Sequence, residues 1–467
     1  MSQKWVYQGI SALARQQQVL LLEDIKKYPW FGVHDNVNIP FRTFQQRIGN
    51  QNHFDSGTAA TILVLKSPLA RWPDRDLRMR QRALGADNLI SAEEIFMLAM
   101  DAGPRIDSHA ISVVLQFLIE SPDFDFETYA FKEDLVFLPR PPSHQLPVGK
   151  DHIPSQYVLK TVHIEEASYE GNVRVLLEWW RQLGRGTLDG QREMGKSQTI
   201  VWAGDQLTVS RLCGLQTFHC EDHNGFDRLD FLVPIFGWFH AQMAIEHSIH
   251  SQYYGTQQGF GLVHVFDLLK RKGLHSPSIQ GNFHNQLREA ILHVTEARFR
   301  DIWCVVGKVE ALRELRERSP LELRSLALQI VTDYTSTEGM IKLSTQGERC
   351  DDLLYQSIQM ARDLLDYVLL DRALSCRDIG LLEDLLPRVL FWYIGGGSSN
   401  YLTEILELLQ GLHREWPADL KCVFSDPFTS HANPSKGLHP PKLLACQHNR
   451  NPKLFSAHRS LARAQRA

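Results

Sequence analysis

Long hydrophobic runs are missing from this sequence, and no stretch approaches the roughly 20 apolar residues needed to cross a bilayer. The first residues, MSQKWVYQGISALARQQQ, also lack the apolar segment of a secretory signal. Cysteine is scarce, with seven scattered residues and no CxxC spacing, which indicates reduced thiols. Together these absences predict a nuclear or cytoplasmic protein that is not secreted and has no membrane partner.

An excess of basic charge is missing as well. The chain carries 50 Lys and Arg against 54 Asp and Glu, a net charge of −4. Eight basic residues and one acidic residue fall from Lys421 onward, so the first 420 residues carry a net charge of −11. The bulk charge therefore does not indicate a nucleic-acid-binding protein, and any contact with DNA would need a local basic patch.

The 467 residues are too many for one simple core. Residues 3–27 have an amphipathic helical pattern, 29–41 has the β-branched and aromatic character of a strand, and 42–66 predicts two further strands. A helix at 173–184, a strand at 199–204, a helix after it and a strand at 229–239 follow. We expect separate helices at 91–101 and 107–120, and mostly helical structure from about 240 to 392.

Without its two inserts, this succession is three strands, helix, strand, helix, strand, helix. It predicts a mixed α/β fold, a ribonuclease-H-like five-stranded sheet interrupted by large helical insertions, in which antiparallel strands 1–3 join parallel strands 4 and 5. The expected segments are an N-terminal helix (1–28), first core part with strands 1–3 (29–66), helical insert and Pro-rich linker (67–154), second core part (155–239), helical insertion (240–392), final core helix (393–416) and irregular basic tail (417–467).

Three acidic residues fall at significant places in this order. Asp35 lies in the first strand, Asp205 ends the fourth strand, and Glu404 lies one turn into the last helix. Two-metal phosphoryl transfer needs carboxylates from several elements, and Mg²⁺ or Mn²⁺ prefers such oxygen ligands. The pattern predicts Asp35, Asp205 and Glu404 as catalytic metal ligands. The plain alternatives are a turn at Asp35, a helix N-cap at Asp205 and a solvated helix residue at Glu404.

Histidine and cysteine offer a competing interpretation. His240, His247 and His250 follow the strand at 229–239, with Cys213, His219, Cys220 and His223 nearby in sequence. A structural zinc site is conceivable there, but the spacing matches no standard zinc module, and packed or exposed histidines are the simpler interpretation. GTQQGFG and GGGSSN lack the Lys-Ser/Thr of a phosphate-binding loop.

The best local patch for phosphate contact is the segment RWPDRDLRMRQR. It contains five arginines in twelve residues, namely Arg71, Arg75, Arg78, Arg80 and Arg82. A solvated surface is the alternative, because arginines that alternate in sequence do not all share one helical face. Residues 270–272, KRK, are a second and weaker candidate.

Several segments resemble one fungal family, the domain of unknown function 6589. They include YPWFGVHDNVNIPF, NQNHFDSGTAATI, HIEEASYEGN, VWAGDQLTVSRLCGL, HSQYYGT, LLKRKGLHSPS and GLLEDLLPRVLFWYIGGGSSNY, and they span residues 1 to about 420. The family looks like a relative of cut-and-paste transposases with a ribonuclease-H-like core. The resemblance implies metal-dependent DNA cleavage and strand transfer, with Asp35, Asp205 and Glu404 as the acids and His240 as an accessory residue.

Two departures bear on that activity. Some animal relatives look to have Gly-Asp-Phe-His where this chain has Gly237-Trp238-Phe239-His240, so one acid is replaced by tryptophan. After Trp416 the sequence leaves the family pattern. The alternative function is therefore a catalytically silent helical interaction or DNA-associated protein. Either function leaves DNA, a protein partner or self-association as expected partners.

Overall fold

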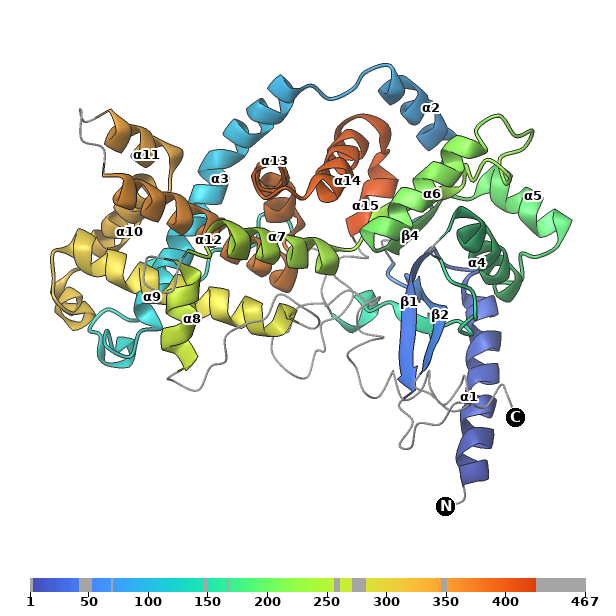
Figure 1. The fold of residues 1–467 in the computed structure, drawn as a ribbon, viewed down its shortest axis with the longest axis horizontal. Helices are drawn as coiled ribbons and strands as arrows, with labels where there is room; N and C mark the ends of the chain where they lie inside the picture. Colours follow the sequence, from blue (N-terminus) through green and yellow to red (C-terminus); the bar gives the residue numbers. More distant parts are fainter. Residues whose placement is uncertain are drawn as a thin grey trace. The chain divides into compact units, whose positions relative to one another are not determined.

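The computed structural model describes residues 3–41, 53–68, 70–145, 149–166, 168–255, 261–270, 283–345 and 351–425. The fold is mixed α/β and rich in helix, with one five-stranded sheet, as predicted (Figure 1). The chain divides into two compact units. Unit 1 comprises residues 1–90, 146–241 and 403–467, and unit 2 comprises residues 91–145 and 242–402. None of the described helices is long and apolar enough to cross a membrane.

The sheet lies in unit 1 and has the strand order β3-β2-β1-β4-β5. β1 pairs antiparallel with β2 and β2 with β3, whereas β1 pairs parallel with β4 and β4 with β5. The strands are β1 (Trp30–Phe41), β2 (His53–Val64), β3 (Ser155–Val158), β4 (Ile200–Gly204) and β5 (Leu232–Phe236). β4 lies between β1 and β5 and is buried at all five positions, which explains its uninterrupted apolar sequence IVWAG.

One strand prediction needs correction. Residues 42–66 were expected to supply the second and third strands, but the third strand of the sheet is Ser155–Val158, beyond the first insert. Residues 42–52 lie outside the described part of the chain. The sequence SQYV is only four residues long and alternates weakly, so its strand state depends on pairing with β2 rather than on local pattern.

The helices of unit 1 precede, follow or connect the strands of this sheet along the chain. They are α1 (Gln3–Asp24), α2 (Arg75–Ala86), α4 (Tyr169–Gln182), α5 (Leu188–Ser197), α6 (Gln206–Phe218), most of α14 (Ser399–Gln410) and α15 (Ala418–Ser425). Residues of α1, α4 and α6 pack with β1, β2 and β4 in one apolar core that contains Trp179, Trp180 and Trp202. An irregular tail was expected from residue 417, but the structure has the helix α15 at Ala418–Ser425. Residues 426–467 lie outside the described part of the chain.

Unit 2 is helical. Its helices are α3 (Ala92–Ile119), most of α7 (Trp238–Gln252), α8 (Leu262–Lys270), α9 (His284–Gly307), α10 (Pro320–Tyr334), α11 (Thr337–Ser344), α12 (Asp352–Cys376) and α13 (Ile379–Gly395). The two helices expected at 91–101 and 107–120 are one helix, α3, with Pro104 inside it. A capping box between Ser91 and Glu94 starts this helix, and buried residues before and after Pro104 hold it together despite the lost backbone donor.

Candidate metal centre

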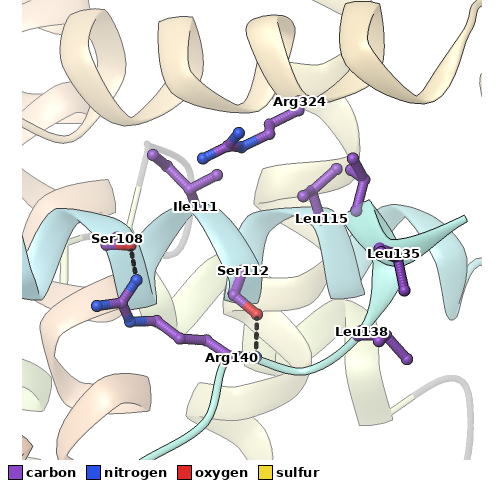
Figure 2. Close-up of a pocket in the computed structure, with 9 residues that line it drawn as sticks. Ser108, Ile111, Ser112, Leu115, Leu135, Leu138, Arg140 and Arg324 are labelled. Atoms are coloured by element: carbon purple, nitrogen blue, oxygen red, sulfur yellow. Dashed lines mark hydrogen bonds between the residues drawn. The ribbon is translucent and has the colours of Figure 1, made fainter. Parts of the chain in front are cut away.

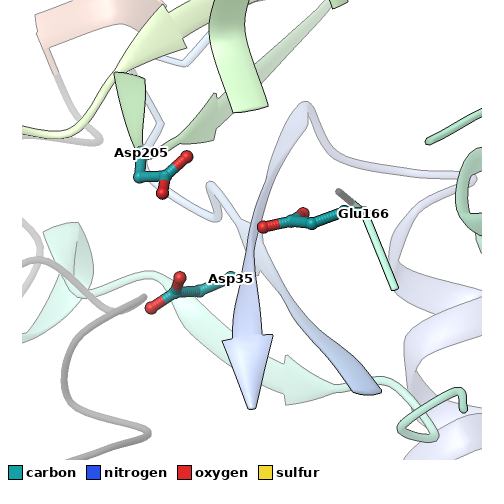
Figure 3. A group of neighbouring side chains, drawn as sticks. All are labelled: Asp35, Glu166 and Asp205. Carbon is teal, nitrogen blue, oxygen red and sulfur yellow. The ribbon is translucent and has the colours of Figure 1, made fainter. Parts of the chain in front are cut away.

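Three carboxylates converge in unit 1. Asp35, Glu166 and Asp205 each offer an oxygen, and these three oxygens all lie within 4.8 Å of one another (Figure 3). Asp35 comes from β1, Asp205 follows the last residue of β4, and Glu166 lies in the segment between β3 and α4. Asp35 and Glu166 are buried, with 6% and 1% of their surfaces exposed, and Asp205 is half-buried.

Strand pairing brings the two aspartates together. Gly32 pairs with Trp202 and Val33 with Ala203 in the parallel register of β1 and β4. Continuing that register by two residues places Asp35 opposite Asp205, at the carboxyl end of β4. The sequence predicted that Asp35 in the first strand and Asp205 at the end of the fourth would converge with Glu404, and the structure brings the two aspartates together.

Each aspartate uses one oxygen for the backbone and keeps the other. The Asn36 amide donates to Asp35 Oδ1 at 2.8 Å, and the Thr208 amide donates to Asp205 Oδ1 at 2.7 Å. The second contact is the N-cap of α6, so Asp205 is a helix cap as the plain alternative proposed. Capping and metal binding are compatible here, because Asp205 Oδ2 is not needed for the cap.

Backbone contacts fix the segment that carries Glu166. Thr58 of β2 forms an isolated antiparallel bridge with Val162, and its hydroxyl donates to Ile164 O at 2.7 Å. From the other side, Asn172 Nδ2 of α4 donates to Glu166 O at 2.7 Å. The backbone is therefore held both before Glu166 and at Glu166 itself, which fixes the position from which this side chain extends.

Two glycines permit this close approach. A Cβ at Gly57 would lie 2.4 Å from Val162 O, and a Cβ at Gly171 would lie 2.1 Å from Glu165 O. Both distances are shorter than any tolerated contact with backbone, so any larger residue at these positions would displace the segment. Glycine at 57 and 171 thus contributes to the position of Glu166.

The electrostatics of the group are unbalanced. Burial, together with the neighbouring Asp205 and Glu166 carboxylates, raises the pKa of Asp35 well above its usual range. Among the described residues, no lysine or arginine forms an ion pair with any of the three carboxylates. Glu166 Oε2 is buried and makes no regular hydrogen bond, although His34 Nε2 faces it at 2.8 Å.

A divalent cation would supply the positive charge that the three acids lack and a partner for Glu166 Oε2. Mg²⁺ and Mn²⁺ prefer carboxylate oxygens, and two oxygens bound to one such ion lie at most about 4.2 Å apart. The separations within this group, none above 4.8 Å, are close to that spacing, and the cation would satisfy Glu166 Oε2, which makes no regular hydrogen bond. The residues present therefore fit a divalent metal ion held by Asp35, Glu166 and Asp205.

Glu404, the third predicted acid, is not a member of this group. It is buried on α14 with 8% of its surface exposed, and Gln206 Nε2 lies 3.4 Å from its Oε1. Gln206 follows Asp205 in the chain, so Glu404 contacts the residue next to one of the three acids. Burial raises the pKa of Glu404 to about 7, with a contribution from nearby Glu407. The solvated-residue alternative for Glu404 is wrong.

Sequence reasoning missed Glu166. The segment HIEEASYEGN contributed to the family resemblance, but it contains two adjacent glutamates and no periodic pattern that would favour one of them. The available signal was its place just before Ser168, which accepts from the Gly171 amide and caps α4. That signal locates the start of a helix but does not reveal which strand it adjoins.

The arginine patch is divided by the fold. Arg78 is 4% exposed and donates to the carbonyl oxygens of Asp230 and Leu232, which corrects its assignment as a phosphate contact. Arg75 pairs with Asp76 and Asp230. Arg71 and Arg80 are exposed and donate only to nearby backbone oxygens, and Arg82 is half-buried. The weaker candidate, KRK, falls almost wholly outside the described residues.

The zinc alternative gains no support from the described residues. The group of Asp35, Glu166 and Asp205 is the one set of three or more potential ligands that these residues bring together. Burial raises the pKa of the Cys213 thiol to about 12, which opposes the thiolate that zinc requires. His250 stacks on Phe266, and His240 lies edge-on to Phe239.

Unit 2 contains a separate pocket of about 320 Å³. Figure 2 shows Arg324 near Ile111, and Arg140 beside Ser108 and Ser112, to both of which it donates. The lining residues are Ser108, Ile111, Ser112, Leu115, Leu135, Val136, Leu138, Arg140 and Arg324. The pocket shares no residue with the carboxylate group, and it contains no acid or base suited to catalysis.

A family model matches residues 85–427, nearly three quarters of the chain. It describes a family of unknown function, DUF6589. The chain belongs to this family. The match includes Glu166, Asp205 and Glu404, whereas Asp35 precedes it. No curated protein and no solved structure matches the chain. Membership of DUF6589 brings no established activity, so the function must be argued from the site.

Proposed function

We propose that unit 1 is the ribonuclease-H-like core of a transposase-derived protein, which binds Mg²⁺ or Mn²⁺ and cleaves DNA phosphodiester bonds. The observation that carries this proposal is the group of Asp35, Glu166 and Asp205, whose oxygens lie within 4.8 Å of one another. The strand order with an antiparallel β2 supports it, because that order places Asp35 and Asp205 side by side. The raised pKa of Asp35 also supports it, since perturbed carboxyl groups gather at functional sites.

In this proposal Asp35, Glu166 and Asp205 hold the cation, each through an oxygen that the backbone does not use. A bound divalent ion would activate the attacking water or 3′-hydroxyl and stabilise charge on the scissile phosphate. Glu404, which accepts from the side chain of Gln206 next to Asp205, acts as a fourth carboxylate. The exposed Arg71 and Arg80 contact the DNA backbone, and strand transfer follows cleavage in the ancestral reaction.

A catalytically silent interaction or DNA-associated protein is the second candidate. One observation favours it. Trp238, at the position of the acid in the animal relatives, is 2% exposed and packs edge-on against Phe236, so it contributes to the core rather than to an acidic site. The family would then retain the sheet as a scaffold. The two candidates differ in whether the carboxylates bind metal and whether they cut DNA.

Two measurements separate the candidates. Mn²⁺ binding is measured by calorimetry on the full chain, and nicking of supercoiled DNA is measured with Mn²⁺ or Mg²⁺. Asp205→Asn is the informative variant, because asparagine still caps a helix but offers less charge to a cation. We expect it to abolish binding and nicking while α6 stays folded, and we expect Glu166→Gln to do the same.

Asp351→Asn is the matched control. Asp351 caps α12 by accepting from the Leu354 amide at 3.0 Å, in the same way that Asp205 caps α6, but it lies in unit 2. This control should bind Mn²⁺ and nick DNA like the wild type. Metal binding without nicking would favour the silent protein, and equal behaviour of Asp205→Asn and Asp351→Asn would reduce Asp205 to a cap.

A further inference from the structure

A tryptophan, a histidine and the metal-site glutamate form a buried chain of contacts. Trp202 Nε1 donates to His34 Nδ1 at 2.7 Å, and His34 Nε2 lies 2.8 Å from Glu166 Oε2, close enough to donate but without the alignment of a regular hydrogen bond. Trp202 is 0%, His34 1% and Glu166 1% exposed, so water does not compete for these contacts. Trp202 belongs to β4, His34 to β1 and Glu166 to the segment before α4.

The direction of the first contact fixes the protonation of His34. An indole nitrogen can only donate, so His34 Nδ1 must accept and carries no proton. The ring proton of the neutral imidazole then lies on Nε2, the nitrogen that faces Glu166. Because Nδ1 is occupied and Nε2 is protonated, neither nitrogen of His34 has a lone pair to offer a metal ion.

The fold makes room for this arrangement at Gly32. A Cβ at Gly32 would lie 2.2 Å from the Trp202 ring, so only glycine allows the indole to pass over β1 and reach His34. Gly32 pairs with Trp202 in the parallel register, which sets the two residues side by side. The indole is held on its other side by Trp180, with ring centroids 5.2 Å apart.

We propose that His34 is a positioning residue for the metal site: Trp202 fixes its tautomer, and His34 Nε2–H holds the Glu166 carboxylate toward the cation. This inference rests on the proposed metal site and adds to it the residues that orient one ligand. A lysine or arginine at this place would neutralise Glu166. An imidazole with one ring proton orients the carboxylate without adding a positive charge.

Groups that orient metal ligands typically change metal affinity by about 10- to 100-fold when removed. His34→Leu removes the donor to Glu166, and we expect the Kd for Mn²⁺ to rise at least about tenfold. His34→Gln should restore most of the affinity, because its amide oxygen can accept from Trp202 while its amide nitrogen donates to Glu166. A residue needed only for packing would not be rescued selectively by this polar replacement.

Trp202→Phe tests the second link. It removes the N–H that fixes the tautomer, so the proton is no longer confined to Nε2, and Mn²⁺ affinity should fall. The matched control is Trp179→Phe. Trp179 is 0% exposed and belongs to the same apolar core, but its Nε1 has no hydrogen-bond partner in the described part of the chain. Trp179→Phe therefore removes an indole N–H without affecting His34.

The experiment is Mn²⁺ titration of the full-length wild type and the four variants by calorimetry, with thermal unfolding as a check on folding. Weak binding by His34→Leu and Trp202→Phe, with near-normal binding by His34→Gln and Trp179→Phe, supports the inference. Equal affinity of His34→Leu and the wild type overturns it but leaves the metal site intact. Absence of Mn²⁺ binding by the wild type overturns both. If His34→Leu does not fold, the two tryptophan variants decide, and equal affinities there overturn the inference.

Discussion

Each unit contains a buried contact between a histidine and a glutamate, and the two contacts have different surroundings. In unit 1, His34 Nε2 lies 2.8 Å from Glu166, and two further carboxylates lie close by. In unit 2, His284 Nδ1 lies 2.9 Å from Glu246. Glu166 has an oxygen without a regular hydrogen bond, whereas Glu246 also accepts from the hydroxyl of Tyr367 at 2.7 Å.

The polar side chains around Glu246 have hydrogen-bond partners. Asp371 accepts two hydrogen bonds from Arg288, each 2.6 Å long, and a third from Gln242 at 2.7 Å. These residues join α7, α9 and α12 through side chains. A buried polar network in which every member has a partner stabilises one arrangement of helices, whereas buried acids without a cation favour binding one. The comparison therefore separates a structural network from a candidate site.

Replacing the positively charged Arg288 in the unit 2 network should have the largest effect on the free energy of unfolding. Arg288→Met leaves the buried Asp371 carboxylate with Gln242 alone, and the free energy of unfolding should fall by about 3 kcal/mol. Urea denaturation, with hydrogen exchange of α12 amides, measures the loss. Arg324→Met is the control, because Arg324 is exposed and forms no ion pair with the described residues. A loss below that of the control would mean that the network does not stabilise unit 2.

Replacing the buried Glu404 on α14 should raise the free energy of unfolding, whereas replacing Arg288 should lower it. The pKa of Glu404 is raised from 4.5 to about 7, so its ionisation opposes folding. Its contribution to stability is fully present below about pH 4.5 and is lost as the pH rises through about 7. In metal-free protein, Glu404→Gln should therefore gain about 2 kcal/mol over the wild type at pH 8. At pH 4.5 the two should be equal.

Urea denaturation of metal-free wild type and Glu404→Gln at both pH values tests this sign. Exposed Glu289→Gln is the control and should give the same difference from wild type at both pH values. A Glu404→Gln variant that loses stability at pH 8 would show that a partner stabilises the carboxylate in the folded protein.

A smaller effect is expected where one neutral hydrogen bond is removed from the unit 2 network. Tyr367→Phe leaves Glu246 with His284, and it should lower the free energy of unfolding by about 1.5 kcal/mol. Urea denaturation measures this change, and added Mn²⁺ should not alter it. The fully buried Tyr393→Phe, in the same unit, provides a comparison for loss of a tyrosine hydroxyl. If Mn²⁺ restored the stability of Tyr367→Phe, a metal ion would bind in unit 2, and the comparison of the two units would fail.

The smallest effect concerns the carboxylate group itself. Asp35→Asn removes a buried carboxyl group whose ionisation is opposed by burial and by two neighbouring carboxylates, so the metal-free protein should gain about 1 kcal/mol of stability at neutral pH. The variant should also lose the rise in melting temperature that Mn²⁺ gives the wild type. Thermal unfolding with and without Mn²⁺ measures both changes. Destabilisation of metal-free Asp35→Asn would mean that the carboxylate is structural and that the comparison fails.

The candidate site was predictable where chemistry follows local pattern. A buried run that ends at Gly204-Asp205, followed by a helical pattern, indicates a strand and a capped helix, and the structure has both. Asp35 lies within a β-branched and aromatic stretch that forms β1. Pattern also gave a mixed α/β, helix-rich class, since strand and helix periodicities alternate along unit 1.

Pattern did not reveal Glu166 or its contacts with neighbouring elements. Glu166 is held by Thr58 through its preceding segment and by Asn172, and these contacts join residues more than a hundred positions apart or across a loop. The same limit explains Arg78, which looks like part of a basic patch in sequence but is buried against Asp230. Neither residue type nor spacing distinguishes such a residue from its exposed neighbours.

The sequence by itself determined those elements that local signals mark, such as β1, β4 and the capped start of α6, because caps, turns and apolar periodicity act over a few residues. It also determined that acids follow or lie within two strands of the core. Only the tertiary structure decided that Asp35, Asp205 and Glu166 converge, that Trp202 reaches His34 over Gly32, and that Glu404 contacts Gln206 instead of joining the three acids. These outcomes depend on strand register and close backbone approach between distant segments, which local pattern does not specify.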